Sequence, residues 1–249
     1  MSTFIPDQNR LCVSKIFLFF VSMFFVGVVS GQKIENKLIF QDNFLLNRWW
    51  SLHGDVMSHI GYCDVKWQSI GARGALGFRA NGWISLEVGG LFAYVYHDRT
   101  FRETELRFHQ SVYVRAPGDK RLKTRHEIRY EQRMINYRPI DVEANSSRVV
   151  YRMEPRFFLS PNVVTVHKGV WFVDGLVSLS FNMKSELPEN DFFQRAAIGG
   201  GIGYALTDFL ETRLLYSRQF GTTKPYYYGE EDGLNSIELS LRHTIKYFD

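Results

Sequence analysis

The sequence predicts an all-β protein, an antiparallel up-and-down transmembrane β-barrel of about ten strands. The usual error in strand ends leaves a range of about eight to twelve strands. Three observations predict this fold. Charged and apolar residues alternate strictly along Arg121–Met134. Weaker alternation of the same kind continues in segments of 11–16 residues to the C-terminus. No stretch after the apolar N-terminal run has the periodicity of an amphipathic helix.

Arg121–Met134 is the clearest of these segments. Every odd position is charged, and the even positions are largely apolar. Side chains of a strand point alternately to opposite faces, so this strand has a charged face and an apolar face, whereas a helix would scatter the charges. Its 14 residues exceed the about 5–6 residues of a typical soluble strand, and a tilted strand needs about 9–11 to cross a bilayer. The apolar face is therefore expected to meet lipid and the charged face to line a lumen.

The N-terminus predicts export. Residues 1–31 contain a weakly basic start, the apolar run Ile16–Val29, and then Ser30 and Gly31. The run is too short for a spanning helix, which needs about 20 residues, and it fits a cleaved signal peptide better than the alternative of an uncleaved anchor. Residues 32–249 then form one barrel domain with a net charge of +3. That domain retains one cysteine, Cys63, so no intramolecular disulfide is expected.

The first three strands are bounded by turn signals. Leu45–Val56 carries Trp49 and Trp50 near its start, and Lys66–Arg79 contains three glycines that suit a curved strand. Asn81-Gly82 is a tight-turn signal, and Trp83–His97 follows it.

The charged strands come next. Phe101–Arg115 alternates Glu103, Glu105 and Arg107 with apolar residues, Pro117-Gly118-Asp119 turns the chain, and Arg121–Met134 is the fifth strand. A polar loop is predicted over 136–147. Arg148–Leu159 then sets four charged residues against an apolar face.

Four further strands complete the chain. Val170–Met183 places the short polar residues Ser178, Ser180 and Asn182 on one face. Asp191–Leu206, which carries Arg195 and Gly199–Gly201, precedes Phe209–Gln219. The long loop Phe220–Leu234 contains Tyr226–Tyr228 followed by acidic residues, and it is interpreted as an interfacial aromatic belt with a solvated loop, or as a binding tip.

Asn235–Phe248 is the last strand, and its alternation is regular. An apolar outer face ending in an aromatic residue is similar to the signal that barrel-assembly machinery reads, although Asp249 follows Phe248 here. Turn lengths agree with a membrane barrel, because Asn81-Gly82, Pro117–Asp119 and Thr207-Asp208 are all short and would share one rim. Ser160–Lys168 is long for that rim.

Several of these segments together resemble a known family. They are Arg125–Arg133 (RHEIRYEQR), Arg148 with Tyr151-Arg152, Gln194-Arg195, and Gly201-Ile202-Gly203-Tyr204. They look like the outer-membrane barrel family catalogued as domain of unknown function 2490, from Trp49 to the C-terminus. The resemblance implies an outer-membrane barrel and supplies no activity.

A charge network is expected on the lumen face. Its predicted members are Glu103, Glu105, Arg107, Arg125, Glu127, Arg129, Glu131, Arg133, Arg148, Arg152, Glu154, Arg156 and Arg195. The lining favours a largely filled interior over a wide pore. His109 and Ser111 are the candidates for a catalytic pair, but residues two apart on a strand lie side by side, which favours polar packing instead.

Three function classes follow from this sequence. The first is a structural or binding barrel of a Gram-negative outer membrane, the second a lipid-modifying enzyme, and the third a narrow solute channel. The expected partners are outer-membrane lipid and the barrel-assembly machinery, with no nucleic acid. No metal or cofactor motif is present in the sequence, so none is expected. A soluble lipocalin-like barrel is the rival fold, and the strand lengths oppose it.

Overall fold

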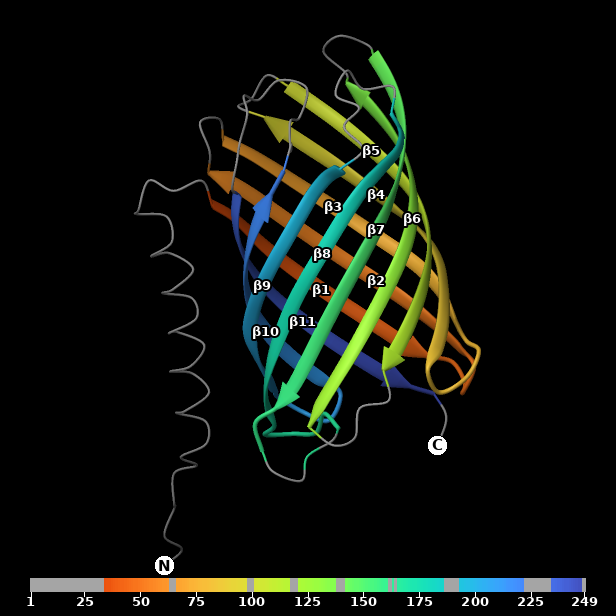
Figure 1. The fold of residues 1–249 in the computed structure, drawn as a ribbon, viewed down its shortest axis with the longest axis vertical. Coiled ribbons are helices and arrows are strands. Elements are labelled where there is room, and N and C mark those ends of the chain that lie inside the picture. Colours follow the sequence, from red (N-terminus) through yellow and green to blue (C-terminus); the bar gives the residue numbers. More distant parts are fainter. Residues whose placement is uncertain are drawn as a thin grey trace, which may run out of the picture.

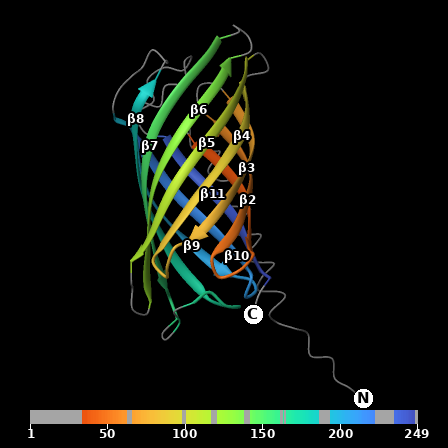
Figure 2. The ribbon, with the colours of Figure 1, turned by 90° about the vertical axis from the view of Figure 1, so that its right-hand side faces the viewer.

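Eleven strands close into one barrel in the computed structural model of the protein (Figures 1 and 2). The structure describes residues 34–62, 66–97, 101–116, 121–137, 142–160, 163, 165–185, 193–221 and 234–247. The strands are β1 (Ile34–Leu45), β2 (Trp50–Tyr62), β3 (Lys66–Arg79), β4 (Ile84–His97), β5 (Phe101–Ala116), β6 (Leu122–Tyr137), β7 (Val142–Phe158), β8 (Trp171–Ser185), β9 (Phe193–Ala205), β10 (Leu210–Phe220) and β11 (Leu234–Lys246). The predicted all-β barrel is confirmed, with one strand more than expected.

The additional strand is β1. Its alternation is weak, because Asn36 and Asp42 share a face with Leu38 and Phe40, while Ile39 lies among the polar residues of the other face. The predicted first strand Leu45–Val56 therefore merged the end of β1 with the start of β2. A turn separates the two strands, and in it the Asn47 side chain accepts hydrogen bonds from the backbone N–H groups of Trp49 and Trp50 at 2.8 and 2.9 Å.

Similar turns recur on the same rim of the barrel. Asn81 accepts hydrogen bonds from the N–H groups of Trp83 and Ile84, and the Thr207 hydroxyl accepts them from Phe209 and Leu210. Side chains of this kind fold back on their own backbone and so favour tight connections. We call this end of the barrel the short-turn rim.

Closure depends on β1. Each strand from β2 to β10 pairs antiparallel with the strand that follows it. β1 pairs antiparallel with β2 and parallel with β11, from Ile34 opposite Asn235 to Leu45 opposite Lys246. A meander with an odd number of strands must close with one parallel pair, because its first and last strands run in the same direction. The barrel is thus mixed at this seam rather than purely antiparallel.

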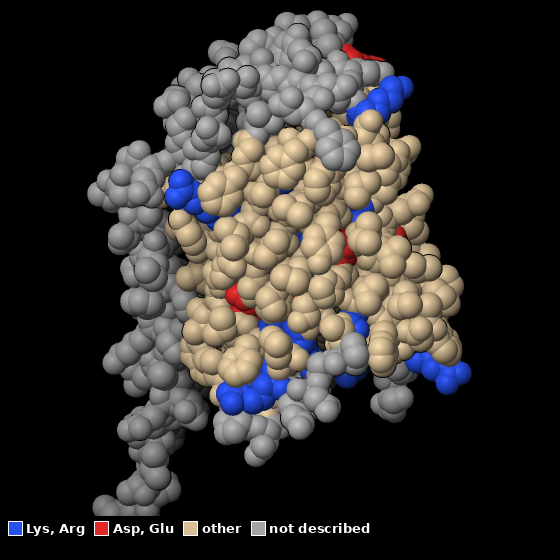
Figure 3. Space-filling model, viewed as in Figure 1, with Lys and Arg blue, Asp and Glu red and all other residues tan. Residues whose placement is uncertain are grey.

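The two faces of the barrel have opposite polarity. Outward positions carry large apolar side chains such as Ile70, Val88 and Ile128, which are 54–59% exposed. Inward positions carry carboxylates such as Glu105, and Glu131 is only 2% exposed. Figure 3 shows uncharged side chains over most of the visible wall, with Lys and Arg mainly toward its lower and upper ends. The arrangement is the reverse of a soluble barrel, whose apolar residues face inward.

One predicted loop differs in length from the observed one, and several predicted features lie outside the described residues. The polar loop predicted over 136–147 is shorter, because β6 continues to Tyr137 and β7 begins at Val142, where alternation persists among small polar residues. Some expectations fall outside the described residues: the predicted signal peptide, the predicted turn at Pro117–Asp119, Cys63, Tyr226–Tyr228 and Phe248. Within the described part of the chain, no helix is long and apolar enough to cross a membrane.

Candidate functional site: the charged lumen

The inner face of the barrel gathers charged residues from nearly every strand. Twelve of the thirteen residues predicted for the lumen network line one internal cavity of about 810 Å³. They are Glu103, Glu105, Arg107, Arg125, Glu127, Arg129, Glu131, Arg133, Arg148, Arg152, Glu154 and Arg195. The thirteenth, Arg156, binds acidic residues on β8 and β10. Period-two alternation on β5, β6 and β7 places twelve of the thirteen on the inner face, and Arg195 joins them from β9.

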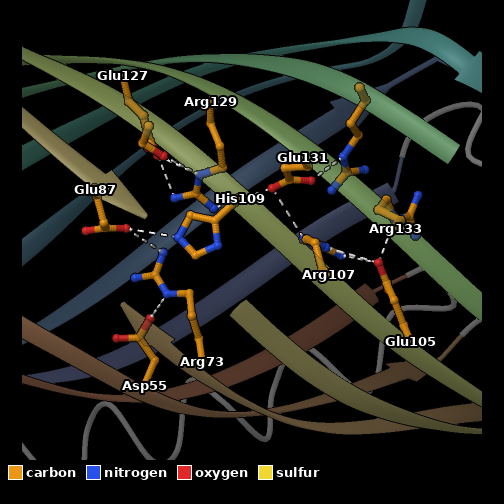
Figure 4. A network of polar contacts seen from close by, with 12 residues as sticks. Asp55, Arg73, Glu87, Glu105, Arg107, His109, Glu127, Arg129, Glu131 and Arg133 are labelled. Atoms are coloured by element: carbon orange, nitrogen blue, oxygen red, sulfur yellow. Dashed lines mark hydrogen bonds and ion pairs between the residues drawn. The ribbon is translucent and has the colours of Figure 1, made fainter. Parts of the chain in front are cut away.

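Glu105 joins two arginines that would otherwise repel one another. Arg107 on β5 lies directly opposite Arg133 on β6. Like charges across a strand pair are destabilising. The Glu105 carboxylate accepts hydrogen bonds from Arg107 Nη2 at 2.9 Å and from Arg133 Nε at 2.6 Å (Figure 4). One buried acid therefore compensates two cations.

Glu131 is the centre of the same network. Arg148 lies directly opposite it on β7 and donates from Nε to Oε2 at 2.6 Å. Arg107 and Arg129 approach Oε1 at 3.5 Å each. Arg129 also donates to Glu127 from Nε at 2.6 Å. These contacts join β5, β6 and β7 through side chains as well as through the backbone.

Glu87 organises a second network on β2 to β5. Its carboxylate lies 3.2 Å from His109 Nε2, accepts a hydrogen bond from the Tyr113 hydroxyl at 3.2 Å, and lies 3.8 Å from Arg73. Arg73 in turn donates to Asp55 at 2.5 Å. Figure 4 shows Asp55, Arg73, Glu87 and His109 pointing toward one another from different strands.

A third network spans part of the interior. Arg156 on β7 makes a two-pronged contact with Asp174 on β8, at 2.8 and 2.9 Å. It reaches Glu211 on β10 at 3.0 Å, and Arg242 on β11 contacts the same carboxylate at 3.1 Å. Planar guanidinium groups suit such paired contacts with carboxylates. Strands that do not pair are thereby joined inside the barrel.

Sequence reasoning did not single out the acids and bases that complete these networks. Those residues are Asp55, Arg73, Glu87, Asp174, Glu211, Arg213, Glu238 and Arg242. Each stands alone or nearly so on the inner face of its strand, so no charge run marked it. The available signal was its inward position in the alternation of a predicted strand.

An apolar cluster fills the interior at the short-turn rim beside β7, β8 and β9. Phe158, Phe172 and Ala205 are buried almost completely, and Val170, at the end of the connection before β8, packs with them. The Arg156 guanidinium lies 3.8 Å from the Phe172 ring centroid. The β7–β8 connection also packs Val166 against this cluster. This packing gives a structural reason for a connection that is long for its rim.

His109 and Ser111 are adjacent on the inner face of β5, and each has a separate partner. His109 contacts Glu87, whereas the Ser111 hydroxyl donates to Glu127 at 3.1 Å and accepts from Arg129 at 3.2 Å. Both residues are at most 3% exposed. The described residues contain no hydrogen bond between this serine and this histidine, which a nucleophile and its general base require. The geometry therefore favours polar packing for this pair.

The cavity has an excess of positive charge. Fourteen Lys and Arg residues line it against nine Asp and Glu residues. Its volume lies within the range of about 300–1,000 Å³ that is usual for small-molecule sites. Among the described residues, no group of three or more His, Cys, Asp or Glu side chains is arranged to hold a metal ion.

Comparison with known proteins gives one finding about family. A family model described as "Protein of unknown function (DUF2490)" matches residues 39–227, which is most of the chain. The match includes β2 to β10 completely and most of β1. No curated protein matches the sequence.

Proposed function

The chain belongs to the DUF2490 family of proteins of unknown function, and from its barrel we propose an outer-membrane protein with a structural or binding role. The observation that carries this proposal is the inverted polarity of the wall. Exposed large apolar side chains project outward from β1 to β10, and most of the carboxylates that project inward are buried. Such a surface is stable in lipid and would aggregate in water.

Strand length and aromatic placement support the same proposal. The strands have 11–17 residues, enough to cross a bilayer at a tilt. Trp49, Trp83, Phe209 and Tyr247 are exposed near the short-turn rim, where a girdle of aromatic side chains would meet the lipid headgroups. The short turns are then periplasmic, as in bacterial barrels.

Cell fractionation tests the location. The mature protein is expected in the outer-membrane fraction and should migrate faster on a denaturing gel when it is not heated, because a folded barrel resists detergent. A periplasmic outer-membrane lipoprotein and a soluble periplasmic enzyme serve as fractionation controls. Recovery of the folded chain in the soluble fraction would contradict the proposal.

Side chains that cross or fill the lumen support the proposal that the interior of the barrel is largely filled. Arg156 bridges β7 to β10, and the apolar cluster around Phe172 fills the short-turn rim on one side. Stable conductance steps are not expected after reconstitution into planar bilayers.

A narrow channel is the second candidate, because residues near both ends, such as Arg48 and Glu103, line the same cavity. Reproducible conductance that is lost on blocking the lumen would favour this candidate.

A further inference from the structure

The middle of β8 interrupts the charged lining of the lumen. Its inner face presents the short side chains of Ser178 and Ser180, and both line the cavity. Ser178 lies opposite Arg152 on β7, and Ser180 lies opposite Arg195 on β9. β7 and β9 therefore each carry an arginine beside β8, and the small serine side chains of β8 leave space between the two guanidinium groups.

Among the arginines predicted for the lumen network, these two have no carboxylate within 4 Å in the described part of the chain, whereas Arg148 and the rest do. Arg152 Nε is buried, and it has no hydrogen-bond partner among the described residues. Arg195 donates from Nη1 to the uncharged Gln219 side chain at 2.8 Å, and it is repelled by Arg152, Arg133 and Arg107. A buried charge without a compensating partner is costly, so this corner of the lumen favours an added anion.

The nearby acids are already occupied. Glu127, directly opposite Arg152 on β6, is bound by Arg129 at 2.6 Å and by the Ser111 hydroxyl. Glu35, which attracts Arg195, is held by Lys37 at 2.8 Å. In the described part of the chain, neither acid comes within 4 Å of these two arginines. Glu154 and Glu238, which also attract Arg152, are held by Arg125 and, at 2.6 Å, by Arg213.

A β-bulge widens the same corner. The pairing of β8 with β9 shifts between Ser180 and Phe181, so that one residue of β9, Gln194, is left without a partner on β8. Consequently Gln194 and Arg195 both line the cavity, although they are consecutive. Gln194 accepts a hydrogen bond from Arg148 Nη1 at 3.2 Å, and this contact fixes a third guanidinium beside the gap. Bulges commonly redirect side chains in this way.

We propose that Arg152, Arg195, Ser178 and Ser180 form a lumenal site for an oxyanion, either a phosphate or a carboxylate group. Two planar guanidinium groups offer paired donors to such a group, and two hydroxyls add further donors. The surplus of basic residues around the cavity attracts the anion, and the cavity volume admits a small molecule that carries it. The site rests on the binding role proposed above and assigns its ligand class.

Calorimetric titration of the purified, folded barrel in a zwitterionic detergent tests the site. The probes are inorganic phosphate and acetate, with chloride at equal ionic strength as the reference for simple charge screening. We expect saturable binding at one site per barrel for at least one oxyanion. We expect Arg152→Gln and Arg195→Gln each to weaken it at least about tenfold, since a hydrogen bond to a charged group is lost.

The matched control is Arg218→Gln. Arg218 lies on β10 but is exposed on the outer face beside Phe220, so its replacement removes the same charge without touching the lumen. The affinity of the Arg218→Gln variant for the oxyanion should equal that of the unaltered protein. Absence of saturable binding in the unaltered protein, equal binding of chloride, or unchanged binding in both lumen variants would each overturn the site.

A gain-of-charge variant covers the case in which the arginine variants do not fold. Ser178→Asp introduces a carboxylate opposite Arg152, where the proposed anion would lie. It should abolish oxyanion binding and raise the urea midpoint of unfolding, because the uncompensated guanidinium gains an internal partner. A lowered midpoint with oxyanion binding retained would refute the proposal. Binding is measured in detergent, so its failure is distinguishable from failure of the outer-membrane assignment.

Discussion

Replacement of Glu131 by alanine removes a lumen carboxylate that three arginines share. Glu131 is 2% exposed and contacts Arg148 at 2.6 Å and Arg107 and Arg129 at 3.5 Å each. Arg107 keeps Glu105 as a partner, and Arg129 keeps Glu127. Arg148 loses its carboxylate and keeps only the neutral Gln194. The variant therefore buries one uncompensated guanidinium and weakens the neutralisation of two others.

The expected cost follows from that geometry. Removing one partner of a buried ion pair costs about 3–5 kcal/mol, because the remaining charge stays desolvated. Water in the cavity lowers this cost, so about 3 kcal/mol is the expected loss. With a urea m-value of about 1–3 kcal/mol/M, that loss shifts the unfolding midpoint by at least about 1 M.

Reversible urea unfolding in liposomes, followed by tryptophan fluorescence and gel mobility, measures this shift. Gln132→Ala is the matched control, since Gln132 is the next residue on β6 and is exposed on the outer face. Its midpoint should stay close to that of the unaltered protein. A double variant, Glu131→Ala with Arg148→Met, should recover part of the loss, because the orphaned guanidinium is gone.

Equal midpoints for Glu131→Ala and Gln132→Ala would refute the reasoning. That result would mean that water solvates the charged face fully and that the ion pairs contribute little, as on an ordinary protein surface. A double variant less stable than Glu131→Ala would also contradict the role assigned to Arg148. In that case its packing, rather than its charge, would dominate.

Three further predictions follow from packing and closure. Gly201→Ala should destabilise the barrel by about 1–3 kcal/mol in urea unfolding, because the added Cβ would lie 2.1 Å from a carbonyl oxygen of β10. Gly74→Ala is the control and should be nearly neutral, because a Cβ at that position has no neighbouring atom within 4 Å. Phe172→Ala should cost about 3–5 kcal/mol in the same assay, and a loss below 1 kcal/mol would show that the apolar cluster is not a packed core. The double variant Leu38→Cys with Leu239→Cys should form a disulfide on oxidation, because the two residues are partners in the parallel β1–β11 pairing. The disulfide would be seen as a gel shift that a reductant reverses. Lack of cross-linking in the folded barrel would count against this pairing.

The sequence by itself determined the fold class and the composition of the two faces. Alternation with a period of two is a local property of a strand, so Arg121–Met134 alone assigns charge to one face and apolar side chains to the other. The tight turns at Asn81 and Thr207 are also local, because each side chain binds backbone within three residues. These features need no knowledge of distant neighbours.

Tertiary structure decided how the strands and the charges are matched. Closure through β1 depends on residues about 200 positions apart, and the polar residues on both faces of β1 obscured its alternation. Which acid binds which arginine depends on strand register: Arg148 lies opposite Glu131 only because β6 and β7 pair in that alignment. The doubled inward pair Gln194-Arg195 arises from a bulge beside Ser180, which shifts one strand against its neighbour. A local period specifies faces, and only the closed barrel fixes the partners across the lumen.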